Sequence, residues 1–369
     1  MKLLQIPRDA LLKPLQAVSG IVEKRHTLPI LSNILVQRKQ DQLSLVATDL
    51  EIQVSTHISL EGKSSEELSL TVSARKLQDI LRALPDGVDA VLDAQNNRLQ
   101  IRAARSRFNL QTLPAGDFPM LVDPGPLQAK IQLTQKVLRE LLLLVQYAMA
   151  QQDIRYYLNG LLLVLEADQL RVIATDGHRL SFAVGEIEAQ AEKREVILPR
   201  KAVLELAKQL EDSDEEVDIE IYVAQVKFRF STVELITKTI DGKFPDYTRV
   251  IPTNYQKEIS LSRPALLQSL QRVAILSNEK FRGVRWMLTT NSLRISCTNN
   301  EQEEAQEELE VTYAGDPLDL GFNITYLLDV LNNVEDEQVT CAFGDASSSM
   351  LVTVAGKPDF RYVVMPMRI

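Results

Sequence analysis

The chain has 369 residues, of which 45% are hydrophobic and 25% are charged, and its formal net charge at pH 7 is −9. This composition is typical of a globular protein, and the acidic balance argues against a protein that holds nucleic acid mainly by neutralising phosphates. The longest apolar runs are far shorter than the roughly 18 residues of a membrane span, and charged residues near the amino terminus interrupt any signal peptide. Two cysteines are too few for a disulfide framework, so we expect a reducing, cytoplasmic location.

The first third of the chain predicts a helix at 7–22, where apolar residues recur at helical spacing, and a second helix at 72–84. Strands are predicted at 34–37, 43–47, 52–60, 68–72, 90–93, 99–103 and 107–113. Further amphipathic segments predict helices at 133–149, 198–210, 261–276 and 322–334. Each third of the chain therefore opens with one helix and carries a second helix after a strand region.

One pattern of a strand followed by a turn recurs along the chain. Residues 170–180, LRVIATDGHRL, alternate in polarity up to Asp176 and Gly177, a pair that favours a tight turn. The pattern also occurs at 43–52 and, more weakly, at 293–305, with offsets of 127 and 123 residues that are close to one third of the chain. Such a period indicates tandem modules. The expected domains are 1–122, 130–248 and 257–369.

Two helices and many strands per module predict an α+β fold in which a sheet carries both helices on one face. Five of the six predicted helices have a basic exposed side, whereas the sixth, at 325–334, has no basic residue. If the modules closed into a ring with the helices inside, six helices about 10 Å wide would leave a hole of about 9 Å, and twelve a hole of about 28 Å. The two grooves of duplex DNA are together about 16 Å deep, so one chain could not encircle DNA but two could.

Several long motifs allow the chain to be compared with a known family. These are KRHTLPILSNILV at 24–36, QDIRYYLNG at 152–160, ATDGHRL at 174–180, SNEKFRGVR at 277–285 and VVMPMRI at 363–369. Over its whole length the chain resembles the bacterial DNA sliding clamp, the DNA polymerase III beta subunit. The resemblance implies a head-to-tail homodimeric ring that slides on duplex DNA without sequence specificity, tethers the replicative polymerase and depends on a separate clamp loader.

The resemblance implies a set of DNA contacts. They are expected at Arg25, Arg75, Gln152, Tyr156 and Tyr157, with Arg200 and Lys201 as further candidates. Taken singly, each basic residue could equally belong to a solvated helix face, and the adjacent tyrosines could belong to the core or stack on exposed bases. The acidic balance is compatible with DNA binding in this family, because a closed ring retains DNA by topology and needs little phosphate affinity.

Ring closure requires a head-to-tail interface that is complete after two subunits. Basic residues crowd the end of the first third and acidic residues crowd the last third, so complementary charges favour contact between these ends, although exposed pairs contribute little singly. The predicted strand 107–113 would be an unpaired edge in a monomer, and pairing across the interface would remove that hazard. The expected interface residues are Arg105, Arg107, Phe108, Leu110, Ile275, Leu276, Glu301, Glu303 and Glu304.

The resemblance also implies a groove between the middle and last domains that binds short peptides of the polymerase, the clamp loader, other polymerases and repair proteins. Leu, Val and Met side chains form an adaptable apolar pocket, while Arg and backbone groups can orient a peptide. The expected groove residues are Leu158, Thr175, Gly177, His178, Arg179, Leu180, Pro245, Arg249, Val250, Met365, Pro366, Met367 and Arg368. Taken alone, Leu180 or Val250 could equally be a core residue.

An enzyme and a scaffold that binds no DNA are the competing interpretations. The three histidines, His26, His57 and His178, are not accompanied by a nucleophile elbow or a cluster of metal ligands. Residues 62–64, Gly-Lys-Ser, lack the first glycine of a phosphate-binding loop. The sequence therefore predicts no catalytic residue, no metal and no cofactor. A tandem repeat alone would permit a scaffold, whereas the motifs favour the clamp.

Overall fold

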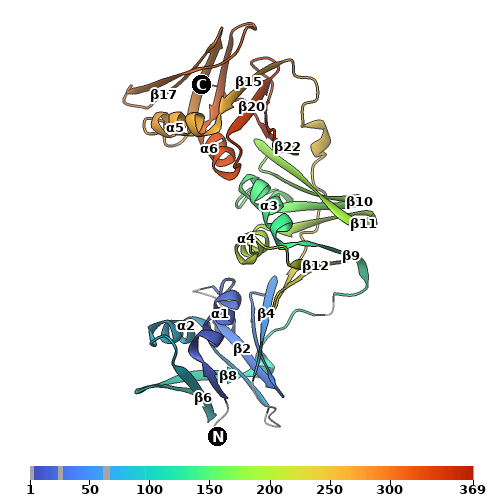
Figure 1. Ribbon diagram of the computed structural model, residues 1–369, viewed down its shortest axis with the longest axis vertical. Helices are drawn as coiled ribbons and strands as arrows, with labels where there is room; N and C mark the ends of the chain where they lie inside the picture. Colours follow the sequence, from blue (N-terminus) through green and yellow to red (C-terminus); the bar gives the residue numbers. More distant parts are fainter. Residues whose placement is uncertain (1–3, 24–27, 61–66, 96, 123, 369) are drawn as a thin grey trace. The chain divides into compact units, whose positions relative to one another are not determined.

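The computed structural model describes residues 4–23, 28–60, 67–95, 97–122 and 124–368, without the side chains of residues 189–191 (Figure 1). Its helices are α1 (Arg8–Ser19), α2 (Ala74–Ala83), α3 (Gln135–Val145), α4 (Arg200–Gln209), α5 (Arg263–Ala274) and α6 (Ile324–Asn333). Its strands are β1 (Leu4–Pro7), β2 (Asn33–Lys39), β3 (Gln42–Thr48), β4 (Ile52–Ser59), β5 (Leu68–Ser73), β6 (Asp89–Gln95), β7 (Arg98–Ala103), β8 (Ser106–Pro114), β9 (Leu127–Thr134), β10 (Gly160–Thr175), β11 (Arg179–Pro199), β12 (Glu216–Tyr222), β13 (Gln225–Phe230), β14 (Val233–Lys238), β15 (Lys257–Ser262), β16 (Gly283–Thr289), β17 (Ser292–Thr298), β18 (Glu304–Glu310), β19 (Leu318–Asn323), β20 (Gln338–Phe343), β21 (Met350–Val354) and β22 (Lys357–Val364). The six predicted helices and the seven predicted strands of the first third are confirmed.

The helix α2 illustrates how the sequence sets each helix. The Ser73 hydroxyl caps the helix by accepting a hydrogen bond from the Lys76 backbone N–H at 3.4 Å. Leu77 and Leu81, four residues apart, lie on the buried face, while Arg75 points to solvent. The hydrophobic stripe and the cap are both local features, so they were readable in the sequence.

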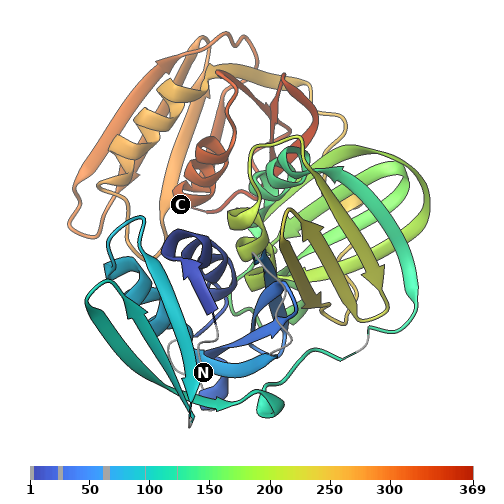
Figure 2. The same cartoon turned by 60° about the horizontal axis from the view of Figure 1, so that its bottom comes forward.

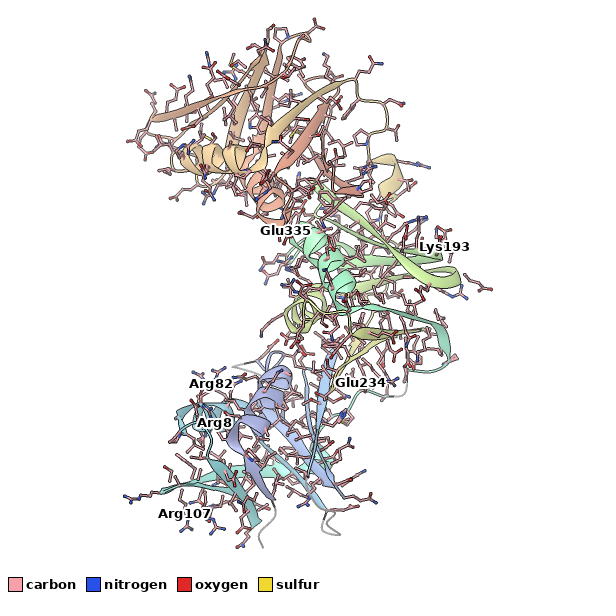
Figure 3. The ribbon with its side chains drawn as sticks, in the orientation of Figure 1. Arg8, Arg82, Arg107, Lys193, Glu234 and Glu335 are labelled. Carbon is pink, nitrogen blue, oxygen red and sulfur yellow. The ribbon has the colours of Figure 1, made fainter. Side chains whose placement is uncertain are left out.

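Arginine at the first position of a helix recurs in the outer modules. Arg8 of α1, labelled in Figure 3, donates from Nε to the carbonyl of Leu81 near the end of α2, at 2.7 Å. Arg263 of α5 donates from Nη1 to the carbonyl of Leu331 near the end of α6, at 3.0 Å. In each module these bonds satisfy carbonyl groups that the end of a helix leaves free. They also tie the first helix to the second.

The turn that defines the repeat is built by similar hydrogen bonds in all three modules, with the second donor three residues on in the first two modules and four residues on in the third. In each module the side-chain oxygen of one residue, Asp49, Asp176 or Asn299, accepts from two backbone N–H groups that follow it, at 2.8–3.1 Å. This is the Asx turn that Asp and Asn favour. The predicted turn at Asp176 and Gly177 is therefore confirmed, and the same chemistry underlies the weaker third copy.

The hairpin before that turn also repeats. Gln40, Ala167 and Asn291 adopt left-handed backbone conformations with φ of 56°, 54° and 57°. In the first and last modules this residue separates two strands, whereas in the middle module strand β10 continues through it with a shift of register. The turn geometry has therefore been retained although the three residue types differ.

Contacts between Cα atoms divide the chain into two compact units, Met1–Leu138 with Leu204–Thr239, and Arg139–Val203 with Ile240–Ile369. The first unit contains a twelve-stranded sheet in the order β1-β6-β7-β8-β5-β2-β3-β4-β14-β13-β12-β9, with α1 beside α2 (Figures 1 and 2). The second unit contains a six-stranded sheet, β10-β11-β22-β21-β20-β15, and a four-stranded sheet, β18-β17-β16-β19, with α5 beside α6. The units differ from the three repeats because the strands of the middle module are shared between them.

Neighbouring modules are joined by one type of strand pairing, which occurs twice. In the first unit β4 pairs antiparallel with β14, with Ile52 opposite Thr237. In the second unit β11 pairs antiparallel with β22, with Arg179 opposite Val364. Both members of the second pair lie 127 residues beyond those of the first. The strand after the Asx turn of one module is thus joined to the last strand of the next module.

The last strand of the first module, β8, is only partly an edge. It pairs with β7 from Arg98 opposite Gln111 to Ala103 opposite Ser106, and its end at Thr112–Pro114 also pairs with β5. The expectation of an unpaired edge over 107–113 was therefore too broad, because the end of the strand continues alongside β5. Among the described strands, the second side of 106–111 has no partner, and the same holds for one side of β18, the outermost strand of its sheet.

Candidate functional site

The second unit contains a cavity of about 430 Å³ beside the turn between β10 and β11. Leu158, Leu180, Phe244 and Val363 form part of a buried apolar cluster at this place. Leu180 and Val363 lie directly opposite each other in the β11–β22 pairing. An apolar cavity with a few convergent polar groups suits a ligand that buries apolar side chains. The lining residues are Arg155, Tyr157, Leu158, Thr175, Gly177, His178, Arg179, Leu180, Phe244, Pro245, Tyr247, Arg249, Val250, Ser349, Val363 and Met365.

The turn between β10 and β11 forms one wall of this cavity. The Thr175 hydroxyl donates to the Arg179 carbonyl at 2.6 Å and accepts from the Gly177 N–H at 3.1 Å. Asp176 Oδ1 accepts from the N–H groups of His178 and Arg179 at 2.9 and 3.1 Å. Gly177 has φ of +89°, a left-handed conformation that glycine adopts without steric cost. The wall is therefore set by four side-chain hydrogen bonds and one glycine.

Arg155 lies over that glycine at the rim of the cavity. Its Nη2 donates to the Asp176 carbonyl at 3.2 Å, and a Cβ atom on Gly177 would come within 2.9 Å of the same nitrogen. Its Nε and Nη2 also donate to the Asp153 carboxylate at 3.0 and 2.9 Å. The hydrogen bonds from the side chain and backbone of Arg155 lower the pKa of Asp153 to about 2. Asp153 is therefore ionised at neutral pH and holds Arg155 in place.

Arg179 has an inward position that the sequence did not reveal. Its side chain is 9% exposed, and it donates from Nε to Asp176 at 3.0 Å, from Nη1 to Asp329 at 2.5 Å and from Nη2 to the Tyr147 carbonyl at 2.5 Å. The guanidinium carbon also lies 4.4 Å from the centroid of the Tyr326 ring. All three nitrogens are thus engaged within the protein. Arg179 borders the cavity, and its guanidinium stabilises the cavity wall through hydrogen bonds to other parts of the protein.

Ten of the thirteen expected groove residues line the cavity, and three do not. Pro366 is absent from the lining, while Met367 and Arg368 line a different cavity of about 490 Å³ beside β16 and β17. The reason is that the Met367 N–H donates to the Gly321 carbonyl at 2.8 Å, which carries the end of the chain onto β19. Sequence reasoning missed Arg155, Phe244, Tyr247, Ser349 and Val363, and it assigned Tyr157, which also lines the cavity, to DNA contact. The repeated FP pair at 118–119 and 244–245 was the available signal for Phe244.

The residues expected to contact DNA differ in their exposure to solvent. Gln152 and Tyr156 are exposed on the loop before β10, with Tyr156 57% exposed, whereas the neighbouring Tyr157 is half-buried and lines the cavity. Arg75 is exposed on α2 and lies 3.8 Å from Asp79. Lys201 is half-buried on α4. Arg25 lies outside the described residues.

Arg200 has a structural position at the start of α4. It donates from Nη1 to the carbonyls of Gln146 and Met149, at 3.4 and 3.1 Å. Burial, together with the nearby positive charge of Arg179, lowers its pKa. Because this guanidinium holds the end of the helical segment that follows α3, its geometry differs from that of a freely exposed basic residue such as Arg75.

The expected interface residues lie on β8 and the turn before it, on the segment after α5, and at the start of β18 and the turn before it. Arg105 and Arg107 are exposed, and Phe108 and Leu110 are half-buried along β8 (Figure 3). Ile275 is 77% exposed and Leu276 is half-buried at the end of α5. The three acidic residues, Glu301, Glu303 and Glu304, are all exposed. A large apolar side chain as exposed as Ile275, next to an edge strand, is typical of a surface that is covered in an assembly.

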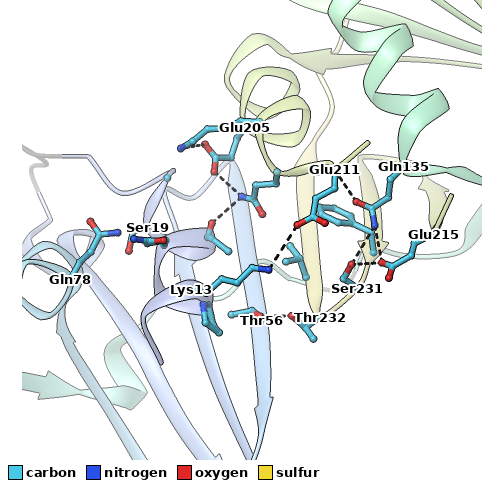
Figure 4. Close-up of a pocket in the computed structure, with 18 of the residues that line it drawn as sticks. Lys13, Ser19, Thr56, Gln78, Gln135, Glu205, Glu211, Glu215, Ser231 and Thr232 are labelled. Carbon is cyan, nitrogen blue, oxygen red and sulfur yellow. Dashed lines mark hydrogen bonds and ion pairs between the residues drawn. The ribbon is translucent and has the colours of Figure 1, made fainter. Parts of the chain in front are cut away.

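The first unit holds a larger cavity of about 860 Å³, and most of its lining residues are polar, with side chains of both charges among them (Figure 4). Glu205 of α4 is 8% exposed there and accepts from Gln209 Nε2 at 2.7 Å, while the same nitrogen donates to the Ala17 carbonyl at 2.9 Å. The Glu205 carboxylate lies against Gly20, where a Cβ atom would come within 2.0 Å of Oε1. These contacts pack α4 against the end of α1, so the side chains at this cavity hold the two helices together.

Within the part of the chain that the structure describes, no group of three or more His, Cys, Asp and Glu side chains is arranged to hold a metal ion. Over the same residues, no helix is both long and apolar enough to cross a membrane.

Family models match the chain in three consecutive segments. The N-terminal domain of the DNA polymerase III beta subunit matches residues 1–122, its central domain matches 132–246, and its C-terminal domain matches 248–368. The threefold repeat of a sheet with two helices is thus the fold of a sliding clamp.

Relatives along the full length agree with this class. The chain is 47% identical over 367 residues to the beta sliding clamp of Pseudomonas putida and 43% identical over 364 residues to that of Escherichia coli, with 99% of each chain covered. A crystal structure of the Pseudomonas aeruginosa clamp bound to griselimycin is 45% identical, with a TM-score of 0.95 and 99% of both chains covered. The beta subunit of Caulobacter crescentus is 39% identical, with a TM-score of 0.92 and 100% of both chains covered. This chain belongs to the DNA polymerase III beta subunit family and functions as a sliding clamp.

Proposed function

We propose that this clamp is a homodimeric ring in which the last module of each chain joins the first module of the other. The observation that carries the proposal is the pairing that joins neighbouring modules twice, β4 with β14 and β11 with β22. A third junction of this type needs the strand after the last Asx turn, β18, and the last strand of the first module, β8. Both have an edge that no described strand covers. Head-to-tail contacts of this kind generate a closed ring when the rotation closes.

The repeat also predicts the register of the third junction. Glu304 is equivalent in the repeat to Leu180. Each residue follows an Asx turn and pairs with the threonine that precedes the same turn, Thr298 or Thr175. The β7–β8 and β13–β14 hairpins share one pairing scheme displaced by 127 residues. The proposed partner of Glu304 in the second chain is therefore Asn109, and that of Gln306 is Arg107.

Charge and apolar area support this register. In this register Arg107, opposite Gln306, would lie diagonally between Glu304 and Glu308, and Arg105, in the turn before β8, would lie at the level of Glu308, so opposite charges would meet along the new strand pair. Glu303 would lie at the other end of the pair, at the level of Leu110. The apolar centre of the junction would consist of Phe108, Leu110, Ile275 and Leu276. Glu301 would extend the acidic side of the contact.

A disulfide tests the register directly. Directly opposed residues of antiparallel strands have Cα separations of about 4.5–5.5 Å, which suit a disulfide. A chain with Arg107→Cys and Gln306→Cys should therefore form a covalent dimer on oxidation. The native cysteines, Cys297 and Cys341, are both buried and free. The matched control, Asn109→Cys with Gln306→Cys, moves one thiol by two residues along β8 on the same face and should link poorly. Monomers only, or equal linkage in both variants, would contradict the register.

We further propose that the ring encloses duplex DNA without sequence preference. The proposed contacts are Arg25, Arg75, Gln152, Tyr156, Tyr157 and Lys201, with Arg200 kept in its structural position. A net charge of −9 is compatible with retention by topology rather than by phosphate neutralisation. The test is retention on nicked circular DNA after loading by a clamp loader with ATP. Rapid loss after one restriction cut is expected, whereas equal retention on circular and linear DNA would refute topological binding.

The cavity beside the β10–β11 turn is the proposed peptide groove. Its occupants would be short peptides of the replicative polymerase catalytic subunit, the clamp loader, and other polymerases and repair proteins. The clamps of Pseudomonas aeruginosa and Bartonella birtlesii have both been solved bound to griselimycin, so this compound is a suitable probe for the groove of the present chain. The apolar lining around Leu180 and Val363 supports the assignment.

The remaining parts of the proposal concern organisation and chemistry. We propose domain bounds of 1–122, 130–248 and 257–369, which follow the period of the repeat. The protein would act in the cytoplasm, without a cofactor, a metal or a reaction of its own, by tethering partners to DNA. Turnover of any substrate by the purified chain would contradict this view.

A further inference from the structure

The sixth helix, α6, differs from the other five because it carries no basic residue. Its polar side chains contact the wall of the proposed groove instead. Asp329 accepts from Arg179 at 2.5 Å, and the Tyr326 ring faces the same guanidinium at 4.4 Å. Neither Asp329 nor Tyr326 lines the groove cavity. The helix therefore reaches the site indirectly, through one arginine.

Arg179 connects this helix to the turn that shapes the groove. The Asp176 carboxylate has two functions, since Oδ1 holds the backbone of the turn while Oδ2 accepts from Arg179 Nε at 3.0 Å. Arg179 thus bonds to Asp176 on one side and, on the other, to Asp329, which lies 150 positions further along the sequence. A charge that is 9% exposed needs such partners, because removing one leaves it poorly compensated. Without Asp329, the guanidinium would have to shift, and Asp176 would shift with it.

From these contacts, and on the basis of the proposed groove, we infer that α6 acts as a brace: it holds the groove wall in the conformation that binds the ligand. Asp329 is a positioning residue that fixes the β10–β11 turn through Arg179, and it touches no ligand itself. The one helix that lacks basic residues thus contributes an acidic side chain to the wall of the proposed groove.

The repeat provides a matched control for this inference. Asp329 is the sixth residue of α6, and the sixth residue of α4, a helix of equal length, is Glu205. Glu205 is also acidic, and it is buried whereas Asp329 is half-buried, but Glu205 packs against Gly20 and Gln209 in the first unit (Figure 4). The two carboxylates therefore have equivalent places in the repeat, and only Asp329 contacts the groove wall.

The experiment compares Asp329→Asn with Glu205→Gln in the full chain, with griselimycin as the ligand. Calorimetry measures its affinity, and hydrogen exchange measures protection of the His178 and Arg179 amides. Asp329→Asn should weaken binding about tenfold, within the usual range of coupling between sites, and should speed exchange at both amides. Glu205→Gln should change neither. Adding Asp329→Asn to Arg179→Gln should cause no further loss, because the carboxylate acts through the arginine.

Several outcomes would overturn the inference. These are affinity of Asp329→Asn within about twofold of the unaltered chain, or a full additive loss in the double variant. If Asp329→Asn does not fold, Asp329→Glu keeps the charge and displaces it, and an affinity equal to that of the unaltered chain would then refute the brace. If the unaltered chain fails to bind griselimycin, the proposed groove is wrong, and the exchange rates of the two amides still decide whether Asp329 holds the turn.

Discussion

Substitution of Gly177 by alanine tests the geometry of the groove wall most sharply. Gly177 has φ of +89°, and a Cβ atom there would lie 2.9 Å from Arg155 Nη2 and 3.0 Å from Nη1. Contacts below 3.0 Å between a Cβ and other heavy atoms require one of the groups to move. Since the backbone of the turn is held by Thr175 and Asp176, we expect Arg155 to move away from the rim.

The effect of Gly177→Ala has two parts. The loss of folding free energy is common to any glycine with a left-handed backbone, whereas the displacement of Arg155 arises only at Gly177. A non-glycine residue in the left-handed region costs about 1–2 kcal/mol, and the lower entropy of the unfolded chain offsets about 0.4–1 kcal/mol of this. Gly87→Ala, with φ of +72° and no atom within 4 Å of the added Cβ, should show this net loss of about 1 kcal/mol alone. Gly177→Ala has the same backbone cost and also displaces Arg155.

The assay pairs denaturant unfolding with calorimetric titration of griselimycin. Both variants should lower the stability of the folded chain by similar amounts. Only Gly177→Ala should weaken griselimycin, on the order of tenfold, as expected for the loss of one good contact in the groove. Equal affinity in the two glycine variants would show that Arg155 does not contribute to the groove, and the account of this wall would be wrong.

Three further predictions concern the interface, the end of the chain and the thiols. Charge reversal of Arg105 and Arg107 to glutamate should weaken the dimer more than it weakens folding, and unchanged sedimentation at low concentration would count against the interface. Deletion of residues 365–369 removes the groove-lining Met365 and should abolish griselimycin binding while retention on circular DNA persists, so a deletion with full affinity would remove the groove assignment. Burial raises the pKa of Cys297 to about 11 and that of Cys341 to about 12, so both thiols stay protonated at pH 8. A disulfide reagent should label them only after unfolding, and rapid labelling of the folded chain would contradict their burial.

The repeat explains why the third junction between modules cannot form within a single chain. The pairings of β4 with β14 and of β11 with β22 each use the strand after an Asx turn and the last strand of the following module. Among the described strands, the three modules contain three strands of each kind but only two such junctions. The strands left over are β18 and part of β8, which are the edges assigned here to the second copy. An edge that pairs in an assembly is no longer a risk for aggregation.

The sequence alone determined the features that depend on near neighbours. The period of the repeat, the six helices and the Asx turns follow from hydrophobic spacing and from side chains that bond to backbone groups two to four residues away. The resemblance, which rests on short sequence motifs, pointed to most of the residues that line the cavity of the proposed groove, including Thr175, Gly177 and Leu180.

Only the tertiary structure decided the features that depend on distant partners. Arg179 belongs to the wall of the groove because Asp329, 150 positions away, balances its charge in a buried place. Met367 and Arg368 line a different cavity because a backbone hydrogen bond to Gly321 directs the end of the chain onto β19. The middle module is shared between two units because its strands pair with both neighbours. The physical reason is the same in each case: a charge or a free backbone group takes the partner that folding brings near, and the sequence around the group does not specify that partner.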